Sequence, residues 1–418
     1  DEAGLHGVFP GLEVRTLTPL SEDESRALVE RLWSVENRPE LVPKVLRAAQ
    51  GNPLFIREYL AYLQEADADE DMPGSIQNIV LARLEHLSIP RRESLTKLSV
   101  FFRNFTREDA LFLQEQTGSP TELVDDALGD LTGTGILERR GVVYAFRHDL
   151  FKQAVYSTLL NYNKRILHRV VADRMRQQAR PNTMRLIRHL LRAEDYRAAA
   201  EVLVSSRTAT VNPEFPAIID ELLEESRIAD VQLRFQLLFT KAALQFNAGR
   251  TEPADEVLRR LLAIAVEHRS PAFLARAYHL MTGFNLQSYS FKKTLVTGRK
   301  AVHYYRAIRT DTQLELNLLG LMATSECLRG RGEEADGIVR RMEHLAAGSA
   351  ELELAETRCS ISFARAAYAD CIAQADAVLP HGSEPSTERP AVAVELRRVM
   401  AAFWGCDFSL TIDSAARL

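Results

Sequence analysis

A pattern that recurs about every 40 residues in the second half of the chain constrains the fold most strongly. In each copy an apolar, helix-like stretch ends in a short turn, and a small residue then opens the next helical stretch. These small residues are Ala254, Thr294, Ala335 and Cys371, in steps of 40, 41 and 36 residues, with flanking copies at Ala199 and Leu410. Two helices per unit at this period are typical of an α-solenoid, in which neighbouring pairs bury each other's apolar faces. We therefore predict a helical-repeat arm over residues 161–418.

The composition indicates a mainly α protein of several domains. The chain has 418 residues, too many for one core, and aromatic residues make up only 7% of it. Its net charge of −5 excludes a strong global attraction to nucleic acid. No apolar run approaches the roughly 20 residues of a membrane span, and the start has no signal-peptide pattern, so we expect a cytoplasmic protein without a membrane partner. The chain opens at Asp1, without Met, in what resembles mid-domain sequence, so we take it to be a fragment.

Residues 1–71 contain three helix patterns that we assign to one small helical domain. Ser21 and Glu24 form a capping-box pattern at the start of the first helix. A second helix stops at Gly51, and Asn52-Pro53 then begins a third, because Asn is a good N-cap and Pro suits the first helical position.

Residues 72–160 show the element order of a winged-helix domain. Apolar-periodic helices are predicted over 76–87 and 91–101, and Thr106 with Asp109 caps a third. Ser119 with Glu122 is expected to cap a fourth helix, which runs to about Leu131. Two short alternating stretches around residues 140–141 then predict a β-hairpin, and a helix over 149–160 closes the domain.

Several short motifs in the first 180 residues resemble one protein family in order. The runs TPLSEDESRALV and AAQGNPLFIREYL are similar to the helical lid of STAND ATPases, the signal-transduction ATPases with numerous domains. The runs IQNIVLARLEHL and YAFRHDLFKQAVYSTLL resemble the winged-helix part of the bacterial subgroup found in large transcription regulators and fused to class III nucleotidyl cyclases. The repeat arm resembles, more loosely, the tetratricopeptide-like (TPR-like) arms of such proteins.

The resemblance implies a nucleotide contact at Gly51, Asn52 and Pro53. In the family a GxP motif in the lid places its proline against adenine, with the glycine allowing close approach. The residues alone leave an alternative open, because a Gly stop, an Asn cap and a Pro first position also make an ordinary helix junction.

Arg147 and His148 are the second pair of candidates. In related STAND proteins a histidine at this winged-helix position reaches the β-phosphate of bound ADP, and the following helix N-terminus favours anions. The alternatives are that His148 only caps or packs the junction and that Arg147 pairs with an acidic neighbour.

The chain has no complete active site and no metal-ligand cluster in its sequence. It lacks a GxxxxGK[ST] phosphate loop, and the resemblance implies that this loop, together with the Mg²⁺ site and catalytic acid, lies upstream of Asp1. ATP or ADP would therefore be a cofactor of the full-length protein, and we expect this fragment alone to bind none.

We read the chain as the regulatory and sensor segment of a STAND-type ATPase. Its partners would be an upstream nucleotide-binding core and an unknown protein or small molecule on the arm, with nucleotide-dependent self-association. The output would be transcription regulation or cyclic-nucleotide synthesis. The alternatives are a nucleotide-independent, protein-binding solenoid and a DNA-binding winged helix. The third helix of that domain carries Glu108, Asp109 and Glu115 against Arg107 alone, which is poor chemistry for a major groove.

Overall fold

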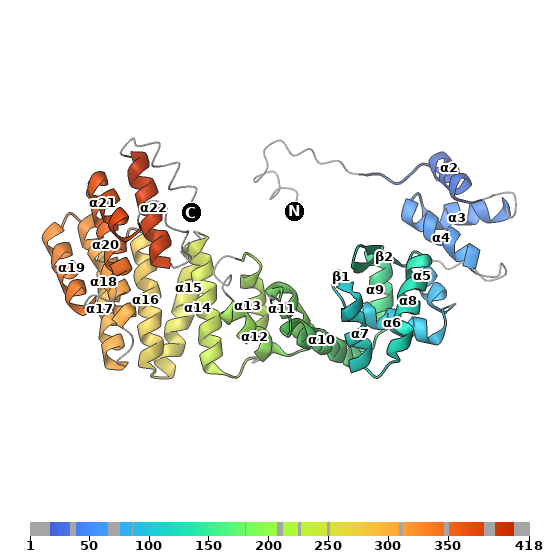
Figure 1. The fold of residues 1–418 in the computed structure, drawn as a ribbon, viewed down its shortest axis with the longest axis horizontal. Coiled ribbons are helices and arrows are strands. Elements are labelled where there is room, and N and C mark those ends of the chain that lie inside the picture. Colours follow the sequence, from blue (N-terminus) through green and yellow to red (C-terminus); the bar gives the residue numbers. More distant parts are fainter. Residues whose placement is uncertain are drawn as a thin grey trace. The chain divides into compact units, whose positions relative to one another are not determined.

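The computed structural model describes residues 17–33, 39–65, 76–85, 87–179, 181–206, 212–224, 227–248, 251–308, 312–346, 351–379 and 389–404. These residues form helices and one small sheet (Figure 1), so the predicted mainly α fold class is confirmed. The chain divides into two compact units, residues 1–195 and 196–418. Among the described helices, none combines the length and the apolar character that crossing a bilayer requires.

Three helices open the first unit and pack around a small core of their own. They are α2 (Glu22–Leu32), α3 (Val42–Ala49), which follows a 3-10 turn at Pro39–Leu41, and α4 (Pro53–Glu65). The Ser21–Glu24 capping box is present, with both reciprocal hydrogen bonds. Val29, Val45, Ile56 and Tyr59 are fully buried where the three helices meet. We refer to these three helices as the lid, after the segment that they resemble in sequence.

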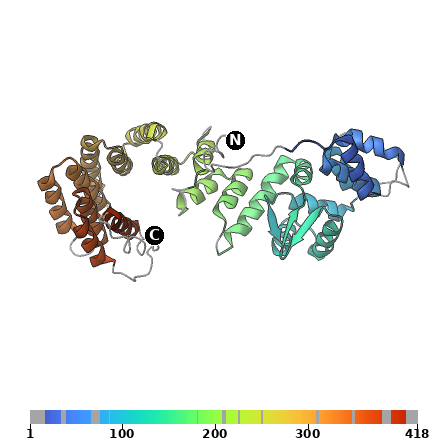
Figure 2. The same ribbon diagram turned by 90° about the horizontal axis from the view of Figure 1, so that it is seen from above.

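The winged helix follows the lid in the first unit (Figure 2). Its elements are α5 (Ile76–Glu85), α6 (Ile89–Leu98), β1 (Asn104–Thr106), α7 (Arg107–Gln116), η3 (Thr121–Leu123), α8 (Val124–Gly133), β2 (Leu137–Arg140), β3 (Val143–Phe146) and α9 (Asp149–Ser157). The predicted hairpin is β2–β3, and the predicted capping box of Thr106 and Asp109 opens α7.

Two details of the winged helix differ from the sequence prediction. The sheet has a third strand, β1, which pairs antiparallel with β3 and gives the order β1-β3-β2. A strand of three residues is too short to show alternation in the sequence. The predicted cap of the fourth helix by Ser119 and Glu122 is wrong, because α8 begins after a 3-10 turn without a side-chain cap. The Ser119 hydroxyl instead accepts a hydrogen bond from Lys97.

The helices α10 (Asn161–Arg176) and α11 (Thr183–Arg192) complete the first unit and meet the winged helix at a buried histidine pair. The Nδ1 atoms of His168 and His189 lie 2.8 Å apart. His168 Nε2 lies 2.9 Å from the Tyr156 hydroxyl, and the Phe102 ring stacks on the His168 ring. Both histidines are buried and pack the joint between the winged helix and these two helices.

The second unit is a stack of antiparallel helix pairs. Its helices are α12 (Tyr196–Ser205), α13 (Phe215–Leu223), α14 (Val231–Asn247), α15 (Thr251–Glu267), α16 (Pro271–Gln287), α17 (Phe291–Ile308), α18 (Thr312–Leu328), α19 (Gly332–Ala346), α20 (Glu351–Ala364), α21 (Tyr368–Val378) and α22 (Arg389–Trp404). Helices α14, α16, α18, α20 and α22 contact one another in succession and form one layer, which α15, α17, α19 and α21 cover.

The recurring small residues explain this stacking. Ala199, Ala254, Thr294, Ala335 and Cys371 are each the fourth residue of their helix, and none is more than 1% exposed. A small side chain at this position lets neighbouring helices approach closely. The helical-repeat prediction is therefore confirmed for the described copies, whereas Leu410 lies outside the described residues.

The buried histidine pair predicts that the first unit is weakened by acid. Burial, and then Arg192, Lys152 and Lys164, lower the pKa of His168 from 6.5 to about 3, and burial also lowers that of His189 well below 6.5. Both rings are therefore neutral when folded. The neutral histidines contribute their full stabilisation above pH 6.5, and this contribution to the free energy of unfolding is lost as the pH falls toward 3. The reason is that the histidines bind protons in the unfolded chain but stay neutral in the folded chain over this range.

Hydrogen exchange of the α10 and α11 amides at pH 7 and pH 5, corrected for intrinsic rates, measures this loss. Each histidine contributes up to about 1.4 kcal/mol per pH unit. The variant His189→Asn keeps a polar atom near the Nδ1 position. It should lower the slope of the free energy of unfolding against pH by the contribution of about one proton. An unchanged slope in this variant would contradict the assignment.

Candidate functional site

The turn between α3 and α4 is built from a tight backbone contact. Gly51 has a φ of +75°, and a Cβ at this position would lie 2.3 Å from the Leu20 carbonyl oxygen. The Leu20 amide also donates to the Gly51 carbonyl over 2.8 Å. The close approach that only glycine permits is thus made here by the segment before α2, so Gly51 has a structural reason within the chain.

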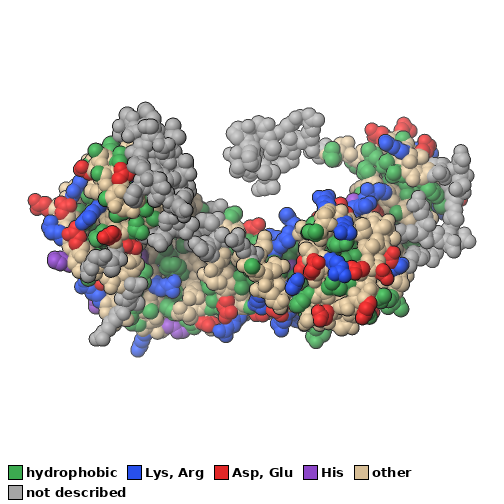
Figure 3. Space-filling model, viewed as in Figure 1, with side chains coloured by type: hydrophobic (Ala, Val, Ile, Leu, Met, Phe, Trp, Pro, Cys, Tyr) green, Lys and Arg blue, Asp and Glu red, His purple; other side chains and the backbone are tan. Residues whose placement is uncertain are grey.

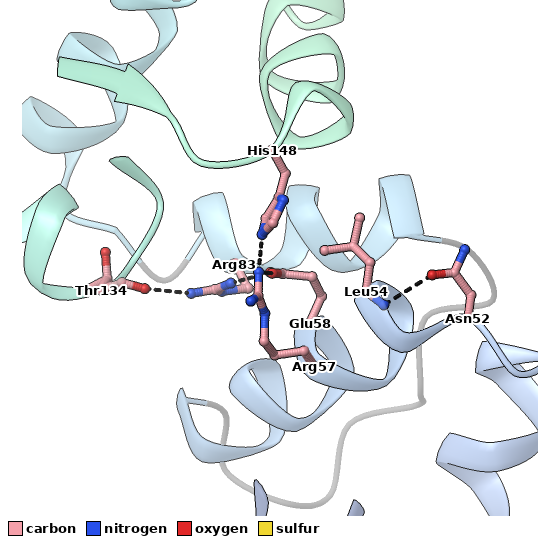
Figure 4. Close-up of polar contacts among 7 residues, drawn as sticks. All are labelled: Asn52, Leu54, Arg57, Glu58, Arg83, Thr134 and His148. Carbon is pink, nitrogen blue, oxygen red and sulfur yellow. Dashed lines mark hydrogen bonds and ion pairs between the residues drawn. The ribbon is translucent and has the colours of Figure 1, made fainter. Parts of the chain in front are cut away.

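Asn52 and Pro53 form the exposed tip of the same turn. The Asn52 side-chain oxygen accepts from the Leu54 amide over 3.0 Å, which makes Asn52 the predicted N-cap of α4 (Figure 4). Pro53 is the first residue of α4 and is exposed. The ring of Pro53 is therefore accessible to an external group at a helix N-terminus.

His148 reaches from the winged helix to the lid. It occupies the N-cap position of α9 with an extended backbone, but its side chain makes no capping hydrogen bond, so the alternative of a cap is wrong. Its Nε2 atom instead contacts Nη2 of Arg57 on α4 (Figure 4). A guanidinium offers only donors, so Nε2 must accept and the proton of the neutral ring must lie on Nδ1.

The charge around His148 favours this neutral form. Burial lowers the pKa of His148, and the positive charge of Arg57 lowers it further, while Glu58 acts in the opposite direction. Arg57 is itself 44% exposed. The pair therefore presents a partly solvated cation next to a neutral imidazole.

Arg147 directly precedes His148 in the chain. Its side chain is exposed, and its guanidinium lies against Gly135, where an added Cβ would be 3.0 Å from Nη1. Within the described residues no carboxylate forms an ion pair with Arg147. The structure thus brings His148, but not Arg147, to α4.

A buried ion pair that the sequence analysis missed joins the lid to the winged helix. Arg83 on α5 donates from Nη1 to Glu58 Oε2 on α4 over 2.6 Å, and its side chain is only 4% exposed. The guanidinium also lies 3.4 Å from the Thr134 carbonyl oxygen and 5.7 Å from the centre of the Phe151 ring. Arg83 thus contacts α4, α8 and α9 from its place on α5.

The face of α4 links the two groups of candidate residues. Pro53 and Arg57 are four residues apart and therefore lie on one side of the helix. Arg57 meets His148, and the neighbouring Glu58 meets Arg83. The exposed turn at Pro53 and the histidine after the wing therefore lie along the same helix, within one surface of the first unit. That surface offers guanidinium, imidazole and backbone N–H donors, which suits an anion.

Comparisons with known proteins leave the family open. A family model described as a domain of unknown function (DUF8739) matches residues 21–71, the region of α2 to α4. An uncharacterized protein of Rhizobium meliloti is 26% identical over 280 residues, which cover 60% of this chain. The chain spans only 27% of the length of that relative.

Two solved structures have related shapes at low TM-scores. One is a Signal Transduction ATPase with Numerous Domains (STAND) protein with a tetratricopeptide repeat sensor from Pyrococcus horikoshii, at 14% identity and a TM-score of 0.44, covering 98% of this chain and 65% of its own. The other is a Rap protein complexed with competence and sporulation factor, at 12% identity and a TM-score of 0.38, covering 95% of this chain and 100% of its own. At such scores neither structure defines the role of any residue here.

Removing Arg83 should separate the lid from the winged helix. Arg83→Met removes the buried partner of the Glu58 carboxylate and leaves it with the Arg57 guanidinium at 3.8 Å, so we expect a loss of about 3 kcal/mol in the free energy of unfolding of the first unit. Urea unfolding followed by the fluorescence of Trp33, in a Trp404→Phe background, reports on the lid.

The matched control is Arg91→Met. This change breaks the Arg91–Asp130 ion pair, whose side chains are 46% and 42% exposed, and should cost less than about 1 kcal/mol. Equal losses for the two variants would contradict the role of Arg83.

Proposed function

We propose that this chain is the lid, winged helix and sensor arm of a STAND-type signalling ATPase. The observation that carries the proposal is the contact of His148 with Arg57 on the face of α4 that begins at Pro53. In the proposal, this surface closes over a nucleotide held by a nucleotide-binding core elsewhere in the parent protein. The chain thus provides one wall of the site, and the cofactor of the parent is ATP or ADP.

The chemistry of the wall suits the two ends of such a nucleotide. Pro53 offers a rigid apolar face to adenine, with Asn52 beside it. Arg57 adds a cation next to His148, and charge-assisted hydrogen bonds from such groups are the strong ones for phosphate. Sequence spacing did not suggest the contact between Arg57 and His148.

The lid–wing contact would serve as the switch. Without a phosphate, Arg57 donates to a neutral His148. An ADP β-phosphate would compete for the same N–H groups and would favour the protonated imidazole, because a nearby anion raises the pKa of histidine. Nucleotide and lid–wing geometry are then coupled by the difference in affinity for the two arrangements.

The repeat arm would carry the input signal. Its stacked helix pairs form an extended surface of the type that binds proteins or small ligands in other helical repeats. Binding there would shift the parent toward an ATP-bound, self-associating state. Transcription regulation or cyclic-nucleotide synthesis would come from a further domain.

The charges on the described surface of the winged helix do not favour the alternative of DNA binding. Arg107, the one base on α7, donates to Asp125 from Nε and Nη2 over 2.6 and 2.5 Å. Glu108 on the same helix is exposed and has a lowered pKa. Basic and acidic side chains are interspersed on the visible face of the first unit (Figure 3). A nucleotide-independent scaffold is the second candidate, because the helix pairs of the arm pack around a core of their own.

The decisive test is ADP binding by the parent protein with its nucleotide-binding core. His148→Ala should weaken ADP at least about tenfold, since a hydrogen bond to a charged group is lost, while adenosine binding stays unchanged. Isothermal titration calorimetry measures both ligands. His303→Ala, on an exposed position of α17, is the control and should change neither affinity. If the wild type, His148→Ala and His303→Ala bound ADP with equal affinity, the result would favour the nucleotide-independent scaffold.

A further inference from the structure

A partly open cavity of about 840 Å³ lies in the first unit and is lined by residues outside α4. It is bounded by α5, α6, the turn after α7, the end of α9 and the start of α10. Its volume is within the range of small-molecule sites, which combine an apolar lining with a few converging polar groups. No step of the proposed nucleotide function uses it.

One wall of the cavity is apolar. It consists of Leu81 and Leu84 on α5, Leu159 after α9, and Ile166 and Leu167 on α10. Ile166 is 40% exposed and lies at the open side of this wall, whereas Leu84 and Leu167 are each 4% exposed. A ligand with a hydrocarbon part would remove this wall from water, which is favourable in proportion to the area covered.

The polar end of the cavity is formed around the Lys97 ammonium. Its Nζ atom donates to the Thr117 hydroxyl over 2.9 Å and to the Ser119 hydroxyl over 2.5 Å. An ammonium has three N–H donors, so these two bonds leave one unused. Among the described residues, no carboxylate oxygen comes within 4.0 Å of this ammonium to form an ion pair. Burial lowers the pKa of Lys97, in keeping with an ammonium that has lost much of its water.

The cavity lining carries two positive and two negative side chains, which differ in their exposure. Thr117 donates its own hydroxyl proton to the Leu113 carbonyl, so the lysine also faces the negative C-terminal end of α7. Glu93 lies one turn earlier on α6 and raises the pKa of Lys97. Glu85 and Glu93 are exposed on the cavity lining, where water screens them, and Arg92 adds a second positive charge. The half-buried part of the cavity is therefore the positive part.

We propose that this cavity binds a small amphipathic carboxylate, with its anionic head on Lys97, Thr117 and Ser119 and its hydrocarbon tail along the leucine and isoleucine wall. The site is independent of the nucleotide proposal, because all its residues belong to this chain and lie outside the α4 surface. A carboxylate bound in the cavity would contact Leu84, which directly follows Arg83 on α5. A ligand here would thus touch the helix that holds the lid.

The full chain and octanoate provide the test, with ligand-observed NMR to measure the affinity. We expect octanoate to bind with a Kd of about 1 mM or tighter, which is reasonable for a ligand of this size. Octan-1-ol, which lacks the charge, should bind at least fivefold more weakly, and octylammonium more weakly still. Lys97→Met should abolish the preference for octanoate over octan-1-ol.

Two further variants separate a lost site from a lost fold. Lys44→Met removes an exposed lysine on α3 and should keep the octanoate preference. Ile166→Trp fills the cavity from its exposed wall and should weaken both octanoate and octan-1-ol, while the melting temperature stays near that of the wild type. The proposal is overturned if octanoate does not bind, if octylammonium is preferred, or if Lys97→Met retains the selectivity of the wild type.

Discussion

The ion pair between Glu58 and Arg83 is the interaction on which the rest of the first unit depends. It joins α4 of the lid to α5 of the winged helix, with side chains that are only 4% and 10% exposed. Breaking this pair leaves the largely buried Glu58 carboxylate with the more distant Arg57 guanidinium at 3.8 Å, which weakens the joint between the two parts. Because Arg57 is the residue before Glu58, the same pair also holds a guanidinium within reach of His148. The geometry of the candidate site is therefore a consequence of this joint.

Local features of the first and second units were predictable from the sequence, whereas the contacts between their elements were not. The caps at Ser21 and Asn52 and the small residues of the repeat act within a few positions along the chain, where spacing carries the information. Arg83 lies 25 residues from Glu58, and His148 lies 91 from Arg57. No periodicity encodes such partners. The wrong cap at Ser119 has the same origin, because its hydroxyl bonds to Lys97, 22 residues away.

The first unit places neutral histidines at both of its joints. His148 lies between the lid and the winged helix, and the pair of His168 and His189 lies between the winged helix and α10–α11. In each case burial keeps the imidazole unprotonated and neighbouring cations reinforce this. The two joints differ in exposure: His168 and His189 are 1% and 2% exposed, while His148 contacts a partly exposed arginine. An external anion could therefore reach a guanidinium beside the histidine at the first joint, which is why we propose the switch there.

The pKa of His148, measured by NMR in the wild type and in Arg57→Gln, tests this account most directly. The account predicts a wild-type value below 6.5, because the ring is partly buried and faces a cation. Removing the Arg57 charge should raise that value, and Arg26→Gln, at an exposed site on α2, should leave it unchanged. A wild-type pKa of 6.5 that does not respond to Arg57→Gln would contradict the account, because His148 would then not lie against the lid.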